Sequence, residues 1–136
     1  MKILIIDDDP LHLSSLETSL IVRNYQCRSF LSPGAAIEAY QSEPFDVIIT
    51  AVKMLEITGE EVLKKVRRIN PKAKVILITG FDDVKIKAGE RSGAYAFFRK
   101  PIVINDLIHT LEKINGKAAL KPGRLKPRTP SKTRAT

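Results

Sequence analysis

The stretch KILIIDDD, residues 2–9, joins a short apolar run directly to three acids. The run is uniformly apolar and rich in β-branched residues, which is typical of a strand buried on both faces of a sheet. Acids at the end of such a strand repel one another, so a fold retains them where a cation or a basic side chain neutralises them. A solvated turn or a helix N-terminus would explain a single aspartate. For three aspartates we favour a divalent-cation site.

Four more apolar runs follow the first, and they alternate with segments of helical periodicity. The expected strands are residues 2–6, 26–31, 46–50, 74–79 and 94–98, and the expected helices are residues 11–23, 33–42, 58–69, 82–92 and 103–115. Regular alternation predicts a parallel sheet covered on both faces. The first, third and fourth runs are the most apolar and suit the centre, whereas the second run alternates and suits an edge. We predict an α/β fold, a flavodoxin-like (βα)5 three-layer sandwich with strand order 2-1-3-4-5.

Several helix boundaries carry side-chain signals. Ser32 before Pro33 predicts an N-cap followed by proline at the first helical position. Thr58 with Glu61 three residues later predicts a capping box. The pair Asn115-Gly116 predicts the end of the last helix.

The positive charge is concentrated at the C-terminus. The chain has a formal net charge of +8, but residues 117–136 hold seven Lys or Arg and no acid, which leaves the rest nearly neutral. That segment is poor in apolar residues and contains three prolines, so we predict a domain over residues 1–116 and a disordered tail or linker over residues 117–136. A single cysteine, Cys27, excludes an internal disulfide and fits a small core residue in a reducing, cytoplasmic protein. No apolar stretch is long enough to cross a membrane.

Polar residues follow four of the predicted strands. The carboxyl ends of parallel strands meet at one edge of a sheet, where open α/β sheets bind ligands. Two acids, a hydroxyl and an ammonium are therefore expected to face one crevice. These polar segments are Asp7-Asp8, Thr50-Ala51-Val52-Lys53, Thr79-Gly80 and Arg99-Lys100-Pro101.

Taken together, these motifs make residues 1–115 resemble the receiver domain of bacterial two-component response regulators. The resemblance implies that Asp8 binds Mg²⁺ directly, that Asp7 binds it through water, and that the Lys53 main-chain carbonyl completes the metal ligands. It further implies that Thr79 and Lys100 contact a phosphoryl group and that Phe97 is the switch residue. The implied partners are a histidine kinase or phosphotransfer protein, with an output protein or a second copy bound through helix four, strand five and helix five.

The chain departs from that family after its third strand. Where the family places the phosphoacceptor aspartate, this sequence has Ala51, and Leu55 replaces a usual proline. Phosphoryl transfer needs an oxygen nucleophile, and a methyl group has no lone pair. Glu56 is near in sequence but is expected to point away. The resemblance thus implies a receiver that cannot accept a phosphoryl group and whose Mg²⁺ binding is weakened, a protein-interaction module and not an enzyme.

Two origins of Ala51 stay open. The other site residues all remain, which favours an introduced Asp-to-Ala knockout or a very recent loss over a natural, phosphorylation-independent pseudo-receiver. A haloacid-dehalogenase-type phosphatase is disfavoured by Leu11, and a flavodoxin by three acids where phosphate would bind. Nucleic acid is expected to bind only weakly, through the basic tail. His12 and His109 lie on predicted helices without metal-ligand spacing, and neither resembles a phosphorelay histidine.

Overall fold

The computed structural model describes residues 1–80 and 93–116. The expected helix over residues 82–92 and the expected tail over residues 117–136 lie outside these ranges. The chain divides into two compact units, Met1–Ile102 and a second that begins at Val103. All five strands belong to the first unit.

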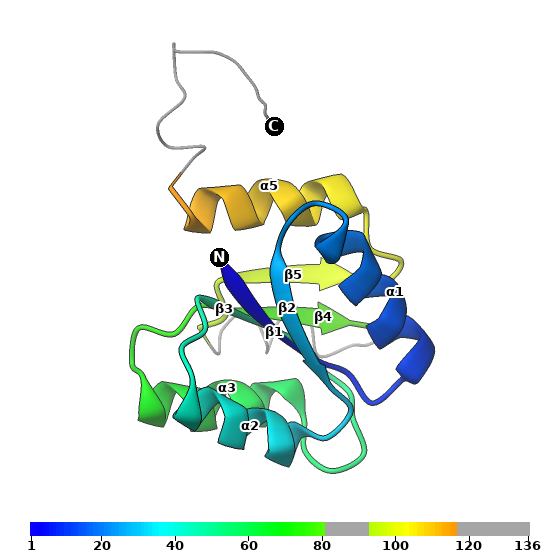
Figure 1. Cartoon of the computed structure of the whole chain (residues 1–136). Helices are drawn as coiled ribbons and strands as arrows, with labels where there is room; N and C mark the ends of the chain where they lie inside the picture. The colour runs from blue at the N-terminus through cyan, green and yellow to red at the C-terminus, as the bar shows by residue number, and fades with distance from the viewer. Residues whose placement is uncertain (81–92, 117–136) are drawn as a thin grey trace. The chain divides into compact units, whose positions relative to one another are not determined.

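The strands form one parallel sheet in the order β2-β1-β3-β4-β5, which confirms the predicted topology (Figure 1). The strands are β1 (Lys2–Ile6), β2 (Gln26–Phe30), β3 (Val47–Ala51), β4 (Val75–Thr79) and β5 (Ala96–Arg99). The first unit also holds the helices α1 (Pro10–Ile21), α2 (Pro33–Ser42) and α3 (Gly59–Ile69), and the second holds α5 (Ile104–Ile114). Because all neighbouring strands are parallel, their carboxyl ends lie along the same edge of the sheet.

The central strands are apolar throughout, as expected of strands that are buried on both faces of a sheet. One face of the sheet packs against α2 and α3, and its cluster includes Leu4, Ile48 and Leu77. The residues that alternate with these, such as Ile5 and Ile49, are also almost fully buried. Helix α1 lies against β1 and β2 and buries Leu13, Leu16 and Leu20. The apolar side chains of the central strands are therefore shielded from solvent. The polar groups that could bind a ligand follow the ends of these strands.

The predicted helix caps are present. The Ser32 hydroxyl accepts a hydrogen bond from the Ala35 N–H at the start of α2. Thr58 and Glu61 form the reciprocal capping box of α3. Helix α5 ends at Ile114 with Asn115 as its C-cap, and Gly116 follows with a φ of +82°, a conformation in which glycine is favoured. Local chemistry thus sets where these helices begin or end.

Two sequence expectations need adjustment at the edge of the sheet. Cys27 is only partly buried, because β2 is an edge strand and lacks a neighbour on one side. Burial, with a smaller contribution from the nearby Glu17 carboxylate, raises the pKa of the Cys27 thiol to about 11. Strand β5 begins at Ala96, two residues later than predicted. The side chains of the edge strands β2 and β5 are therefore less buried than those of the central strands.

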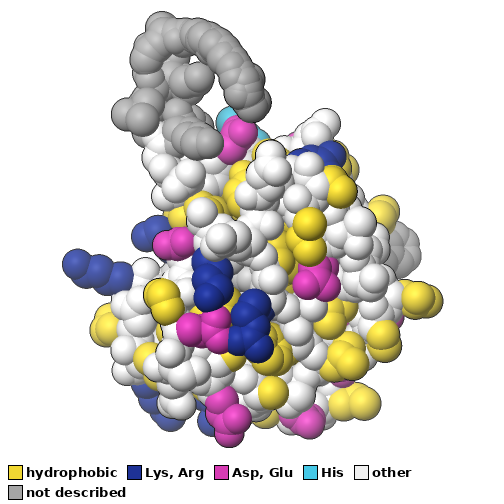
Figure 2. Space-filling model, viewed as in Figure 1, with side chains coloured by type: hydrophobic (Ala, Val, Ile, Leu, Met, Phe, Trp, Pro, Cys, Tyr) yellow, Lys and Arg dark blue, Asp and Glu magenta, His cyan; other side chains and the backbone are white. Residues whose placement is uncertain are grey.

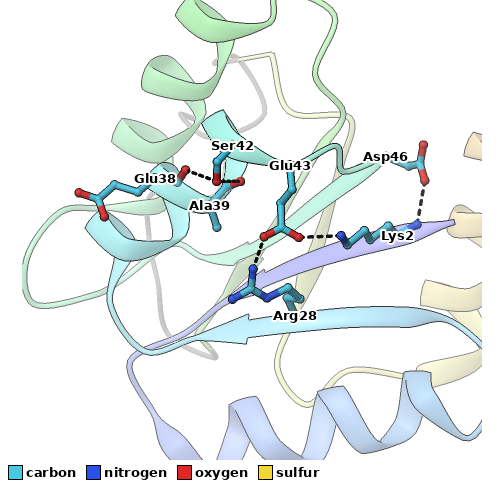
Figure 3. A network of polar contacts seen from close by, with 7 residues as sticks. All are labelled: Lys2, Arg28, Glu38, Ala39, Ser42, Glu43 and Asp46. Atoms are coloured by element: carbon cyan, nitrogen blue, oxygen red, sulfur yellow. Dashed lines mark hydrogen bonds and ion pairs between the residues drawn. The ribbon is translucent and has the colours of Figure 1, made fainter.

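An ion-pair network joins the first residue of β1 and the middle of β2 to the end of α2 (Figure 3). The Glu43 carboxylate contacts the Lys2 ammonium at 2.6 Å and also pairs with the Arg28 guanidinium. The Lys2 N–H donates to Asp46 at 2.7 Å. None of these residues follows the carboxyl end of a strand, so the contacts hold the sheet to α2 and are separate from the acidic run.

Acidic and basic side chains stand next to one another on the face shown in Figure 2, instead of gathering into a patch of one sign. This mixture agrees with the near-neutral body that the sequence predicts. Among the described residues, no helix is long and apolar enough to span a membrane.

We predict that Glu43→Gln lowers the stability of the fold near neutral pH. The Lys2 hydrogen bond, followed by the charge of Arg28, outweighs partial burial and lowers the pKa of Glu43 below its usual 4.5. A carboxyl whose pKa is lower in the folded state stabilises the fold above its unfolded pKa, and that contribution is lost as pH falls through the folded value. Urea unfolding at several pH values should show a difference at pH 7 that shrinks on acidification below 4.5.

The matched control is Glu38→Gln, on the same helix. The Glu38 carboxylate points away from the network in Figure 3, so this change should leave unfolding nearly unaffected at either pH. Equal losses of stability in the two variants would contradict the stabilising role of Glu43. A loss in Glu43→Gln that grows on acidification would also contradict it.

Candidate functional site

Three aspartates end β1 and begin α1, and each has a different partner. The Asp9 carboxylate caps α1, since it accepts hydrogen bonds from the N–H groups of Leu11 and His12 at 3.1 and 3.4 Å. The Asp8 carboxylate accepts the Leu55 N–H at 2.8 Å. The helix-cap interpretation thus explains Asp9 alone, and Asp7 and Asp8 need another account.

Asp7 is a nearly buried carboxylate, with 3% of its surface exposed. Its Oδ1 atom accepts the Asp9 N–H at 3.0 Å. Its Oδ2 atom lies 2.5 Å from His12 Nδ1 and 3.6 Å from Lys100 Nζ. Both oxygens therefore have partners within the protein. One of these partners, Lys100, follows β5, which is separated from β1 by β3 and β4 in the sheet.

The charge of Asp7 is stabilised despite its burial. Burial alone would raise the pKa of this carboxyl, because it disfavours the ionised form. The His12 hydrogen bond, the Asp9 N–H and the positive charge of Lys100 together outweigh burial and hold the pKa of Asp7 below its usual value. The carboxylate is thus ionised at neutral pH and forms a negative centre at the carboxyl end of β1.

Ala51 is the last residue of β3 and is 4% exposed. It is paired with Ile78 of β4, and the Val52 N–H donates to the Ile78 carbonyl at 2.8 Å. The next residue of β4 is Thr79, which is fully buried and whose hydroxyl lies 3.4 Å from the Gly80 carbonyl. Ala51 is therefore paired with the residue that comes directly before Thr79, the last residue of β4.

Lys100 follows β5 and is tied to the same edge through its backbone. Its N–H donates to the Thr79 carbonyl at 2.9 Å, and its peptide bond to Pro101 is cis. Its side chain is 30% exposed, and its ammonium lies 3.6 Å from Asp7 Oδ2. The structure thus brings Asp7 and Lys100 together as the convergence of strand ends predicts.

Phe97 lies in the middle of β5, opposite Leu77 of β4. It is partly buried and packs against the cluster formed by one face of the sheet with α2 and α3. No contact between Phe97 and Asp7 or Lys100 is found among the described residues. Any role in switching would depend on a change in its packing.

The loop after β3 is held close to α3 by a glycine. The Gly59 N–H donates to the Val52 carbonyl at 2.8 Å. A Cβ atom at Gly59 would lie 2.3 Å from the Ala51 carbonyl oxygen and 3.0 Å from the Val52 Cα atom. Only a residue without a side chain therefore permits the backbone of residues 51–52 to adopt this position.

The donor set fits a hard cation that retains water. Among residues 1–80 and 93–116, no group of three or more His, Cys, Asp or Glu side chains could hold a metal ion. Asp7 and Asp8 supply carboxylate oxygen, and the Lys53 carbonyl lies on the loop that leaves the same sheet edge. Mg²⁺ prefers oxygen and commonly keeps several waters, so two carboxylates and one carbonyl are compatible with it.

The His12 contact was not predicted from the sequence, which drew attention only to the absence of metal-ligand spacing around the two histidines. The available signal was positional. His12 occupies the third position of a helix capped by Asp9, so the same short turn that ends β1 places its ring beside Asp7.

Comparison with known proteins places this geometry in a family. The family model for the response regulator receiver domain matches residues 3–112. Over 114 residues the chain is 30% identical to the response regulator receiver protein CpdR of Brucella abortus, covering 83% of this chain and 95% of that protein. It is also 30% identical to the transcriptional regulatory protein ZraR of Escherichia coli, covering 83% of this chain but only 26% of ZraR. The chain therefore spans about a quarter of the length of that relative.

Solved structures agree with the fold. A response regulator receiver domain protein from Clostridium thermocellum superposes with a TM-score of 0.78 at 29% identity, covering 88% of this chain and 98% of that one. The receiver domain of sensor histidine kinase PA1611 from Pseudomonas aeruginosa, at 17% identity and a TM-score of 0.77, covers 85% of this chain and 97% of its own. That structure has a magnesium ion coordinated in its active site cleft.

We predict that Gly59→Ala displaces the backbone at Ala51. The added Cβ atom meets main-chain atoms, which cannot rotate away, and such overpacking costs about 1–3 kcal/mol. Gly34→Ala is the control, because it also lies in the first turn of a helix and its Cβ would meet only the Ser32 hydroxyl at 3.8 Å. Urea unfolding and amide NMR shifts at residues 51–52 measure the effect. Equal stability of the two variants would contradict the close packing.

Proposed function

The chain belongs to the response regulator receiver domain family, and we propose that it is a receiver whose phosphoacceptor position is occupied by Ala51. The observation that carries this proposal is the contact between Asp7 and Lys100 at the sheet edge where Ala51 ends β3. Asp7 and Lys100 contact each other at this edge, and β3, one of the two strands between them in the strand order, ends in a methyl side chain. This arrangement is what remains of an acceptor pocket when the acceptor carboxylate is absent.

The pocket can position a phosphoryl group but cannot receive one. We assign Lys100 and Thr79 to the phosphoryl oxygens, since an ammonium and a hydroxyl can both donate to them. Acceptance requires a nucleophilic oxygen in line with the donor phosphorus. Ala51 has no such atom. Glu56 lies five residues further along the chain, within the loop between Val52 and Gly59, and we expect its side chain to point away from the acceptor position.

Magnesium is the cofactor that this donor set supports. Asp8 would bind it directly, Asp7 through water, and the Lys53 main-chain carbonyl would supply a third oxygen. When bound, the ion would neutralise phosphoryl oxygens. With Ala51 in place, one carboxylate ligand and one negative charge are missing, so binding should be weaker than in a receiver with an aspartate there.

The partners follow from the proposed role in two-component signalling, which takes place in the cytoplasm. They are a histidine kinase or phosphotransfer protein, and an output protein or second copy that binds helix four, strand five and helix five, with Phe97 as the switch. The expected fourth helix, residues 82–92, lies outside the described residues. The alternative is a pseudo-receiver that binds its partner without phosphorylation, and the retention of Asp7, Asp8, Thr79 and Lys100 favours an introduced or recent loss instead.

We predict that the chain gains no phosphoryl group from a phosphoramidate and Mg²⁺. Intact-mass measurement should show the unmodified protein, and Ala51→Asp should restore labelling because it returns the missing nucleophile. Stoichiometric phosphorylation of the unsubstituted chain would overturn the proposal. Failure of Ala51→Asp to accept a phosphoryl group would favour the pseudo-receiver instead.

The matched control is Ala51→Asn. Asparagine is close in size to aspartate but its amide is a poor nucleophile, so this variant should remain unlabelled. Labelling of Ala51→Asn would mean that restored volume, and not a restored carboxylate, accounts for the result.

A further inference from the structure

Each oxygen of the Asp7 carboxylate already has a partner within this chain. Oδ1 accepts the Asp9 N–H, and Oδ2 is shared by His12 at 2.5 Å and Lys100 at 3.6 Å. The His12 contact is the shortest of the three. A cation that used Oδ2, directly or through a bound water, would have to share this oxygen with His12 and Lys100 or displace them.

The position of His12 follows from how α1 begins. The Asp9 carboxylate accepts the main-chain N–H groups of Leu11 and His12, and this fixes the first turn of the helix. The His12 ring then reaches back to the end of β1, and its side chain is 22% exposed. Because the backbone is held by Asp9 and not by the ring, the ring can leave Asp7 without unwinding the helix.

We infer that His12 competes with a divalent cation for the Asp7 carboxylate. In the absence of the cation, the His12 ring occupies the oxygen that the cation or its bound water would use. The inference rests on the proposed function, since it concerns the same acidic pocket. It adds a positioning residue that holds Asp7 in the absence of a cation and must release it when one binds. Ala51 shifts this competition further toward His12, because it removes a carboxylate that would help to hold the ion.

The test is a magnesium titration of the full chain with His12→Ala. This change removes the competing donor and leaves a carboxylate that is 3% exposed with fewer partners, so a cation gains more by binding it. Magnesium affinity measured by calorimetry should rise roughly tenfold, the effect of losing one hydrogen bond to a charged group. His109→Ala removes the other histidine, which is exposed on α5, and should leave the affinity unchanged.

A second measurement uses the unsubstituted protein and does not depend on how a variant folds. Addition of Mg²⁺ should shift the ring NMR signals of His12 and leave those of His109 in place. An affinity that is unchanged or weaker in His12→Ala would overturn the inference, and so would magnesium binding that leaves the His12 ring signals unmoved. Neither readout involves phosphorylation, so a failure of Ala51→Asp to be labelled would count against the proposed function alone.

Discussion

The buried negative charge of Asp7 is the constraint on which the rest of the pocket depends. An ionised carboxylate with 3% of its surface exposed is costly unless positive or donating groups surround it. The fold supplies them from separate segments: the Asp9 amide from the turn after β1, His12 from α1, and Lys100 from the end of β5. These segments meet because the sheet is parallel and its strands end together.

The sequence alone predicted most of this framework. The order β2-β1-β3-β4-β5 followed from which runs were apolar throughout and which alternated, since full burial of a central strand leaves no polar position. The caps at Ser32 and Thr58 followed from side chains whose hydrogen bonds are local. Boundaries were less certain: α1 begins at Pro10 and β3 extends through Ala51, each one residue beyond expectation.

What could not be predicted was contact between side chains. Strand-end convergence placed Asp7 and Lys100 at one edge, but their separation depends on side-chain rotamers that no spacing rule supplies. The His12 contact was missed because histidines were considered as ligands in pairs, whereas here one histidine serves one buried acid. The close approach of Gly59 to Ala51 was also not evident, since it depends on where the loop after β3 meets α3.

We propose that Asp7, Thr79 and Lys100 surround the position of an absent acceptor carboxylate. The most direct measurement is the amide NMR spectrum of the chain and of Ala51→Asp with Mg²⁺ and beryllofluoride, a phosphoryl mimic that binds to an acceptor aspartate. We predict that the unsubstituted chain shows no shift at Thr79 or Phe97, because without an acceptor the mimic does not bind and cannot favour one state of the switch. Ala51→Asp should show shifts at both residues. Sizeable shifts in the unsubstituted chain, or none in Ala51→Asp, would contradict it.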